Sequence, residues 1–199
     1  MAGILEVARR EFADKGLSGA RIDAIAEATQ TSKRMIYYYF GSKEGLYLAV
    51  LEEAYRKVRE TESALNLDGL SPVQALRTLV EFTFDHHRNN EDYIRIVMSE
   101  NMERGAYLVR SEKIRDLNKP AITAIQRLYA RGVAEGSFRE GLDPVDIHAS
   151  ISALSFFNVS NQYTFGAIYK TVSFEGEAAA MRRKNVVDMV LRFVRKDLS

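Results

Sequence analysis

Residues Gly19 to Phe40 read GARIDAIAEATQTSKRMIYYYF, and this stretch decides how the amino-terminal part of the chain folds. Apolar residues at helical spacing predict one helix over about Arg21–Ala28 and another over about Ser32–Tyr39. Only residues 29–31 separate them, so the second helix must follow the first through a tight turn. Two short helices joined in this way are typical of a helix-turn-helix.

The second of these helices carries side chains that suit contact with nucleic acid. Ser32 is a good N-cap, and Lys33 and Arg34 follow it in the first turn, where a recognition helix offers donors to base edges. Successive helical residues point about 100° apart, so at most two of the three tyrosines at 37–39 can face a core. A Lys-Arg pair is also common on an ordinary solvated helix face, and spacing alone leaves both interpretations open. The candidate DNA contacts are Arg21, Ser32, Lys33, Arg34, Met35, Tyr37, Tyr38 and Lys43.

The net charge of the whole chain at first argues against nucleic acid. Its 199 residues include 28 Lys and Arg against 27 Asp and Glu, a formal charge of +1, whereas phosphate binding favours an excess of positive charge. The stretch from Thr31 to Lys43, however, holds three basic residues and no acidic one. A DNA partner would meet this local positive surface, so the total charge does not exclude it.

The rest of the chain reads as helix, and no alternating strand pattern of useful length occurs. Gly16 is a plausible end for the first helix, and each of the three prolines, Pro120 included, sits where a helix can begin. We therefore expect an all-α protein of about nine helices. A three-helix helix-turn-helix domain for DNA binding is expected over residues 1–45, and a helical bundle for ligand binding and dimerisation over residues 46–199.

Several classes of protein are unlikely on composition. The chain has no cysteine, which excludes disulfide scaffolds and thiolate metal sites. Its three histidines form no HExxH pair, and it has neither a glycine-rich phosphate loop nor a GxSxG motif. We expect no metal, no cofactor and no enzyme activity; a helical enzyme or adaptor with a fortuitous amino-terminal motif is the alternative. No run approaches the roughly 18 apolar residues of a membrane span, and no signal-peptide core is present, so a cytoplasmic protein is expected.

Residues Ile4 to Leu48 resemble the DNA-binding domain of the TetR family of transcriptional regulators. The resemblance rests on FADKG at 12–16, IAEA at 25–28, Ser32-Lys33, IYYYF at 36–40 and SKEGL at 42–46.

The chain departs from that family pattern at three places. Ala20 stands where the family commonly has a threonine at the cap of the second helix, and Arg21 can take over its phosphate contact. Gln30 occupies a turn position where glycine eases a positive φ, which predicts some strain. Arg34-Met35 replaces the small residues common in the recognition helix, so the operator sequence is open.

The resemblance implies a homodimeric repressor that binds a pseudo-palindromic DNA operator and is released by a small organic inducer. In such proteins the last two long helices form the dimer surface, here about Pro144–Tyr169 and Ala178–Asp197. These side chains are the candidates, although ordinary core positions are the alternative for each: Ile147, Ile151, Leu154, Val186, Val190, Phe193 and Val194.

Ligand candidates come from two parts of the carboxy-terminal region. Asn158, Asn161, Gln162 and Phe165 share one face of a largely apolar predicted helix, where amides need hydrogen-bond partners. Those amides can bond across a dimer interface, bond to each other or line a ligand cavity, and the sequence leaves all three open. Leu154–Tyr169 also resembles the RutR branch of the family, which implies a pyrimidine-like or aromatic effector. Aromatic side chains with a few polar groups suit an organic ligand, and six such residues lie earlier, although helical aromatics are more often core. They are Phe84, His87, Tyr93, Met98, Asn101 and Tyr129.

Overall fold

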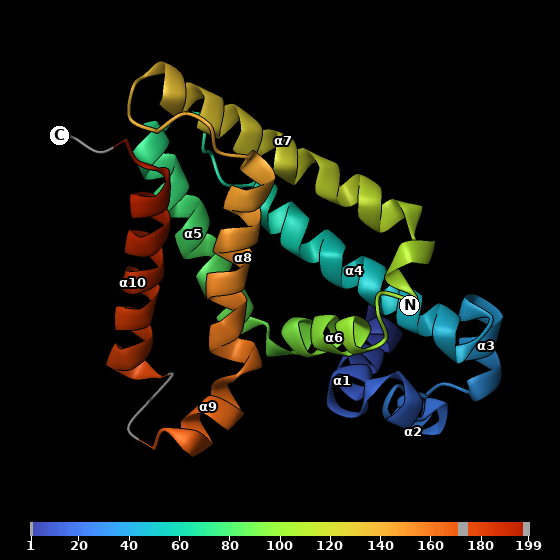
Figure 1. Ribbon diagram of the computed structural model, residues 1–199. Helices are drawn as coiled ribbons and strands as arrows, with labels where there is room; N and C mark the ends of the chain where they lie inside the picture. The colour runs from blue at the N-terminus through green and yellow to red at the C-terminus, as the bar shows by residue number, and fades with distance from the viewer. Residues whose placement is uncertain (1, 171–174, 197–199) are drawn as a thin grey trace. The chain divides into compact units, whose positions relative to one another are not determined.

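The computed structural model of the protein describes residues 2–170 and 175–196, which form an all-α fold (Figure 1). Its elements are α1 (Ala2–Gly19), α2 (Ile22–Ala28), α3 (Lys33–Phe40), α4 (Lys43–Ser63), α5 (Pro72–Asn89), α6 (Glu91–Met102), the 3-10 turn η1 (Leu108–Arg110), α7 (Glu112–Ala134), α8 (Pro144–Ser160), α9 (Gln162–Ile168) and α10 (Gly176–Val194). Within the described ranges, β pairing is limited to one isolated bridge between Phe138 and Arg195. The all-α prediction is confirmed.

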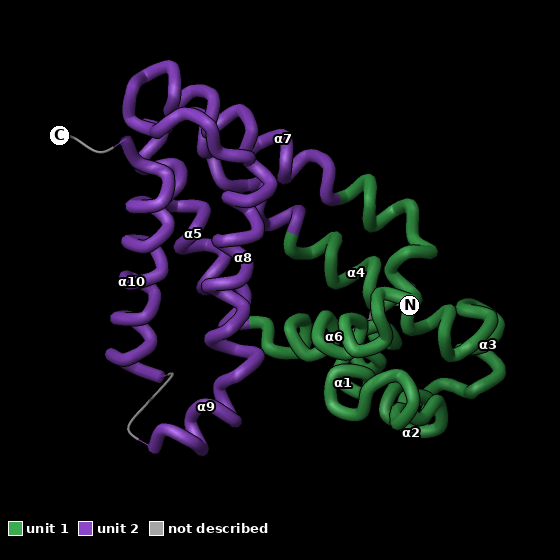
Figure 2. The backbone as a smooth tube through the Cα atoms, viewed as in Figure 1, with its two compact units in different colours: residues 1–58, 90–117 green, residues 59–89, 118–199 purple. Residues whose placement is uncertain are grey.

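The chain packs into two compact units (Figure 2). The first comprises residues 1–58 and 90–117, and the second residues 59–89 and 118–199, so α4 and α7 contribute to both. The expected boundary near residue 45 falls inside the first unit, because Leu46 and Leu51 of α4 are buried in the same core as the helix-turn-helix. As a division of function, residues 1–45 and 46–199 stay a prediction.

The first unit is built around an aromatic pair and is fastened by charged side chains. Phe12 of α1 and Tyr47 of α4 are fully buried and meet edge to face, with ring centroids 5.1 Å apart. Arg9 of α1 forms an ion pair with Asp92 of α6 at 3.0 Å, and Arg95 of α6 donates to the carbonyl of Ala13 at 2.9 Å. These contacts hold α1, α4 and α6 together as the support of α2 and α3.

The second unit is centred on α5, α8 and α10, which pack against one another (Figure 1). Its core contains Val80 and Phe84 of α5, Ile151 of α8 and Val190 of α10, all buried. Arg183 of α10 adds a two-pronged hydrogen bond to Asp85 of α5, with distances of 2.8 to 3.1 Å.

Pro120 does not begin a helix, contrary to the sequence expectation, but lies inside α7. The helix starts earlier because the Ser111 hydroxyl accepts the backbone N–H of Ile114 at 3.1 Å, a serine cap. Proline removes only one backbone donor, and the buried side chains of Ala121 and Ile125 continue the apolar stripe beyond it. Burial of that stripe keeps the helix intact across the proline.

The helix expected over Pro144–Tyr169 is in fact two helices, α8 and α9, which raises the number from nine to ten among the described residues. The break lies at Asn161, whose φ and ψ are −112° and 3°. Its side-chain amide donates to the hydroxyl of Ser160 at 2.7 Å, and local bonds of this kind compete with helix continuation. Burial also ends at Val159, so no core contact forces the helix onward.

The turn between α2 and α3 has the conformation that the sequence suggested. Gln30 has a φ of 51°, in the left-handed region that glycine adopts most easily. The backbone N–H of Thr31 donates to the carbonyl of Ala26 at 3.0 Å and closes the end of α2. The expected positive φ at Gln30 is confirmed, and so is the break at Gly16, which has a φ of 66° inside α1.

Replacing Gln30 by glycine should stabilise the protein. A non-glycine residue in the left-handed region costs about 1 kcal/mol, so Gln30→Gly should raise the free energy of unfolding by about 0.5–1 kcal/mol in urea titrations. The matched control is Gln126→Gly on the exposed face of α7, which should lower it by about 1 kcal/mol. Destabilisation by Gln30→Gly would contradict the strain assigned to this turn.

Candidate nucleic-acid interface

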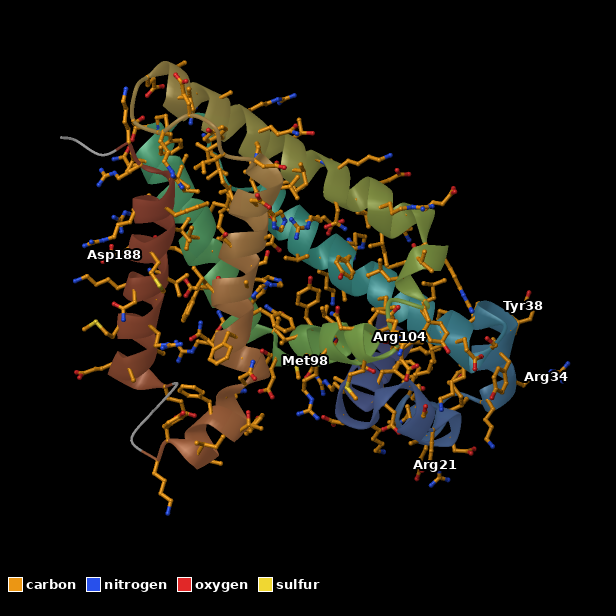
Figure 3. All side chains as sticks on the ribbon, viewed as in Figure 1. Arg21, Arg34, Tyr38, Met98, Arg104 and Asp188 are labelled. Atoms are coloured by element: carbon orange, nitrogen blue, oxygen red, sulfur yellow. The ribbon has the colours of Figure 1, made fainter. Side chains whose placement is uncertain are left out.

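Helix α3 shows almost all of its side chains to solvent. Ile36 is its one buried residue, whereas Met35 and the three tyrosines at 37–39 are exposed, Tyr38 by 78%. Exposed apolar surface often marks an interaction site, so these side chains are candidates for a contact surface. Arg34 and Tyr38 point outward from this helix in Figure 3. Helix geometry allowed at most two of these tyrosines to face the core, and in the structure none of them is buried.

The amino end of α3 is organised as the sequence predicted. The Ser32 hydroxyl accepts the backbone N–H of Met35 at 3.2 Å, which confirms Ser32 as the N-cap. Lys33 forms an ion pair with Asp23 of α2, and both side chains are about half exposed. Arg34 is exposed and open to a partner. To bind a phosphate, Lys33 would exchange its ion pair with Asp23 for the new one, whereas Arg34 has no such pair among the described residues to break.

Arg21 and Lys43 lie at the ends of neighbouring helices. The N-cap of α2 is Arg21 itself, not Ala20, which is buried one residue earlier. The backbone N–H of Arg21 donates to the Glu11 carboxylate at 3.0 Å, so its position is set through the main chain while its side chain stays exposed. Lys43 begins α4, and its ammonium donates to the carbonyl of Ser18 at 3.2 Å. All eight candidate DNA contacts belong to α2, α3, α4 or the residues that cap them.

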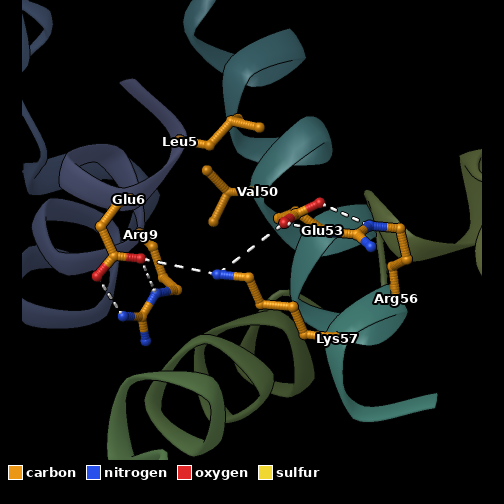
Figure 4. Close-up of a pocket in the computed structure, with 7 residues that line it drawn as sticks. All are labelled: Leu5, Glu6, Arg9, Val50, Glu53, Arg56 and Lys57. Atoms are coloured by element: carbon orange, nitrogen blue, oxygen red, sulfur yellow. Dashed lines mark hydrogen bonds and ion pairs between the residues drawn. The ribbon is translucent and has the colours of Figure 1, made fainter. Parts of the chain in front are cut away.

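A pocket of about 400 Å³ lies between α1 and α4 in the first unit (Figure 4). Its lining is mostly charged: Leu5, Glu6, Arg9, Val50, Glu53, Arg56 and Lys57. Glu6 pairs with Arg9 at 2.7 Å, Glu53 pairs with Arg56 at 2.6 Å, and Lys57 lies 3.9 Å from each carboxylate. Hydrogen bonds from arginine lower the pKa of both Glu6 and Glu53. The charges compensate one another, and the ion pair between Lys57 and Glu6 joins α4 to α1. None of the ligand residues predicted from the sequence lies in this pocket.

The predicted ligand residues do not form one group. Tyr93, Met98 and Asn101 belong to the first unit and the others to the second. Tyr129 has a loop-fastening role, because its hydroxyl donates to the carbonyl of Arg139 at 2.8 Å and accepts the N–H of Leu142 at 2.9 Å.

The shared face expected for four residues of one helix is also wrong. The break at Asn161 places Asn158 on α8 and Gln162 and Phe165 on α9. Phe165 packs its ring against Phe157 and Tyr169, with centroids 5.5 and 4.6 Å away.

Buried polar side chains do gather between α5, α8 and α10 of the second unit. Asn158 is buried, donates to the carbonyl of Leu154 at 2.6 Å and accepts from the guanidinium of Arg182 at 2.9 Å. One turn earlier on α8, the Ser155 hydroxyl is buried without a hydrogen bond to any described residue. His87 of α5 is buried with its ring 6.1 Å from that of Phe156. Ser155 and Arg182 escaped sequence reasoning, although a serine one turn from Asn158 in an apolar helix was a usable signal.

His87 should make the stability of the protein depend on pH. Burial, followed by the charges of neighbouring His86, Arg59 and His148, lowers the pKa of His87 to about 4. Below the ordinary histidine pKa the unfolded chain then binds the extra proton, so stability falls as the pH falls.

The free energy of unfolding should drop by about 2 kcal/mol between pH 7 and pH 5 through this residue. Denaturant titrations of wild type and His87→Gln across that range measure the drop, with His148→Gln as the control. An undiminished pH slope in His87→Gln would refute the assignment.

Most of the residues expected at a dimer surface are core. Their side chains lie in the apolar core of the chain's own second unit and have no surface left for a partner: Ile147, Ile151, Val186, Val190 and Val194. Leu154 is partly buried against the same core, and Phe193 alone is exposed. The outward faces of α8 and α10 carry other apolar residues at four-residue spacing. These are Val145, Ala149, Ala153 and Phe157 on α8, and Met181, Met189 and Phe193 on α10, where the polar Asn185 interrupts the series.

Metal-ligand clusters and membrane-spanning helices are both absent among the described residues. No group of three or more His, Asp or Glu side chains among them can hold a metal ion. No described helix is both long enough and apolar enough to cross a bilayer.

An exposed recognition helix on a helix-turn-helix, joined to a second helical unit, defines a helix-turn-helix transcriptional regulator. A sequence model described as "Bacterial regulatory proteins, tetR family" matches residues 4–50, and one described as "Tetracyclin repressor-like, C-terminal domain" matches residues 72–190. The chain belongs to the TetR family, which confirms the resemblance seen in the sequence.

Named relatives agree with this assignment. The HTH-type transcriptional repressor NicS of Pseudomonas putida is 33% identical over 193 residues, which cover 97% of this chain and 91% of the relative. The transcriptional regulator RutR of Escherichia coli K12 is 32% identical over 143 residues, 72% of this chain and 64% of the relative. The crystal structure of a transcriptional regulator, SCO4942 of Streptomyces coelicolor, superposes with a TM-score of 0.72 at 26% identity and covers 97% of both chains. These relatives are regulators of transcription, and members of the family are not enzymes.

Proposed function

We propose that the protein is a ligand-responsive, DNA-binding repressor that acts as a homodimer in the cytoplasm and leaves its operator when it binds a small organic inducer. The observation that carries the proposal is α3, which buries Ile36 alone and shows its basic and aromatic side chains to solvent. Such a helix fits the major groove, where its amino-terminal residues reach base edges.

In the proposed complex the candidate residues contact different parts of the DNA. Lys33 and Arg34 lie in the first turn of α3 and contact base edges, with Met35 against apolar base surfaces. Tyr38 and Lys43 donate to phosphates, which position the helix without reading sequence. Arg21 contacts phosphate from the amino end of α2.

The outward faces of α8 and α10 suit the second copy of the chain. Two apolar stripes at four-residue spacing are the ridges that pack when helices interdigitate. Alanines on α8 permit close approach, while Met189 and Phe193 on α10 supply bulk. A dimer presents two recognition helices, and a pseudo-palindromic operator offers two half-sites about 34 Å apart.

The buried polar group of the second unit is the proposed effector site. Ser155 has an unused hydroxyl, and Asn158 and His87 lie among apolar side chains, a combination suited to a flat organic molecule with a few polar atoms. A pyrimidine-like or aromatic compound fits that description. Because α4 and α7 belong to both units, a change at this site can be transmitted along them and alter the separation of the two recognition helices.

DNA binding tests the proposal directly. The wild-type protein should shift DNA from upstream of its own gene with a steep salt dependence, because each phosphate contact contributes about 0.9 to the log–log slope. Lys43→Ala should weaken binding to all sequences alike, whereas Arg34→Ala should change the preference among operator variants. Absence of any sequence-preferring shift at low salt would refute the repressor assignment, and an unchanged preference in Arg34→Ala would refute its role as a base reader.

The dimer surface has its own test. Met189→Asp places a carboxylate on the outward stripe of α10 and should convert the dimer to monomer in sedimentation at micromolar protein, because a buried unpaired charge is strongly unfavourable. Ala130→Asp on the exposed face of α7 is the control and should leave the dimer intact. A dimeric Met189→Asp variant would exclude this surface.

A further inference from the structure

The connection between α6 and α7 contains an arginine that the helix-turn-helix does not include. Arg110 ends η1, which belongs to the first unit with α1 to α3. The connection is held in place from inside the unit, since the buried carboxylate of Glu100 accepts the backbone N–H groups of Tyr107 and Leu108 at 2.8 and 2.7 Å. Arg110 therefore projects from a fixed base.

This connection lies along the second and third turns of α4. The ring of Tyr107 meets that of Tyr47 edge to face, with centroids 5.4 Å apart. A few residues further on, the Ser111 hydroxyl donates to the Glu52 carboxylate at 2.8 Å. Tyr107 therefore lies one helical turn beyond Lys43, and from there residues 107–111 run in the same direction as α4.

The side chain of Arg110 turns back toward the start of α4. Its guanidinium carbon lies 5.1 Å from the centre of the Tyr107 ring, a cation–π contact that draws the group back toward the residue that packs against Tyr47. Hydrogen bonds from its own backbone N–H and from Ser42 lower the pKa of the Glu44 carboxyl, and the charges of Lys43 and Arg110 lower it further. The positive charge of Arg110 therefore reaches the turn that carries Lys43.

The donors of Arg110 remain available for a partner. Its side chain is exposed and lies over the face of the Tyr107 ring. It forms no ion pair with any residue that the structure describes. A guanidinium packed on an aromatic ring keeps its N–H edge free and is well suited to phosphate.

We propose that Arg110 binds a DNA phosphate beside the one bound by Lys43, so that the DNA-binding surface extends from the helix-turn-helix onto the α6–α7 connection. This inference rests on the proposed DNA binding. Because phosphate contacts carry no sequence information, Arg110 adds affinity to every DNA alike and leaves the choice of operator to α3.

A second role for Arg110 must be separated from this one. Glu44 is an exposed acid next to Lys43 and repels phosphate, so Arg110 can also assist binding merely by neutralising Glu44. The two roles differ when Glu44 is removed. A direct phosphate contact persists in a Glu44→Gln protein, whereas a neutralising effect disappears.

The experiment is a double-mutant comparison of the full-length protein by fluorescence anisotropy on operator DNA and on a scrambled duplex. Arg110→Gln is made in the wild-type and Glu44→Gln backgrounds, and Kd is measured across a series of salt concentrations. Arg115→Gln is the matched control, because Arg115 is an exposed arginine in the first turns of α7 that pairs with Glu112. Arg110→Lys keeps the charge, and denaturant unfolding of each variant confirms that it is folded.

Arg110→Gln should reduce the log–log salt slope by about 0.9 for each protomer in both backgrounds. Its affinity for both duplexes should fall by the same factor, several-fold or more at moderate salt. Arg115→Gln should leave the slope unchanged, and Arg110→Lys should retain most of it. An unchanged slope in Arg110→Gln, or a loss confined to the background that contains Glu44, would overturn the inference while the repressor assignment stands. If the wild-type protein bound neither duplex, the repressor assignment itself would fall.

Discussion

Helix α3 depends above all on the burial of one side chain, Ile36, which is its one fully buried residue. A helix of eight residues is not stable alone in water, because the cost of starting it is not recovered over two turns. Ile36 supplies what the length cannot, since it is fully buried in the same core as Phe12, Ile25 and Tyr47. Phe40 at the end of the helix is partly buried against the same core, and the remaining side chains of α3 are exposed. The surface of α3 can therefore carry tyrosines and cations that would be poorly placed in a core.

Because the other side chains of α3 are exposed, its charged residues are exposed as well. The chain as a whole is nearly neutral, but the stretch from Thr31 to Lys43 holds three basic residues and no acidic one. Asp23 shows how the surface is kept in check, because it pairs with Lys33 while Arg34, one residue later, is exposed. An ion pair between two half-exposed side chains is weak, so a phosphate in the right place can replace the carboxylate. In the proposed complex, the local arrangement of charges therefore matters more than the net charge of the chain.

Much of the fold could be predicted from the sequence, and the failures share a physical cause. The helix-turn-helix was readable because its helices are short, clearly bounded and separated by a turn whose strained residue, Gln30, could be identified. The start of α8 at Pro144 was predicted, but its core-facing side was not, because the helix is apolar on two sides at once, with Ile147 and Ile151 facing the core and Val145 and Phe157 facing out. Periodicity cannot choose between two apolar faces. The polar group around Asn158 was found only in part, since Arg182 reaches it from a helix 24 residues away.

The left-handed conformation of Gln30 also limits which sequences can occupy this turn. Branching at Cβ is excluded there by collision with the backbone, so valine, isoleucine and threonine are closed to this position. Glycine, asparagine and aspartate are open to it, because they enter the left-handed region at little cost. Among single-residue variants of this chain, position 30 should therefore accept asparagine, aspartate or glycine and reject side chains that branch at Cβ. The backbone conformation of residue 30, and not the polarity or charge of its side chain, then decides which amino acids this turn accepts.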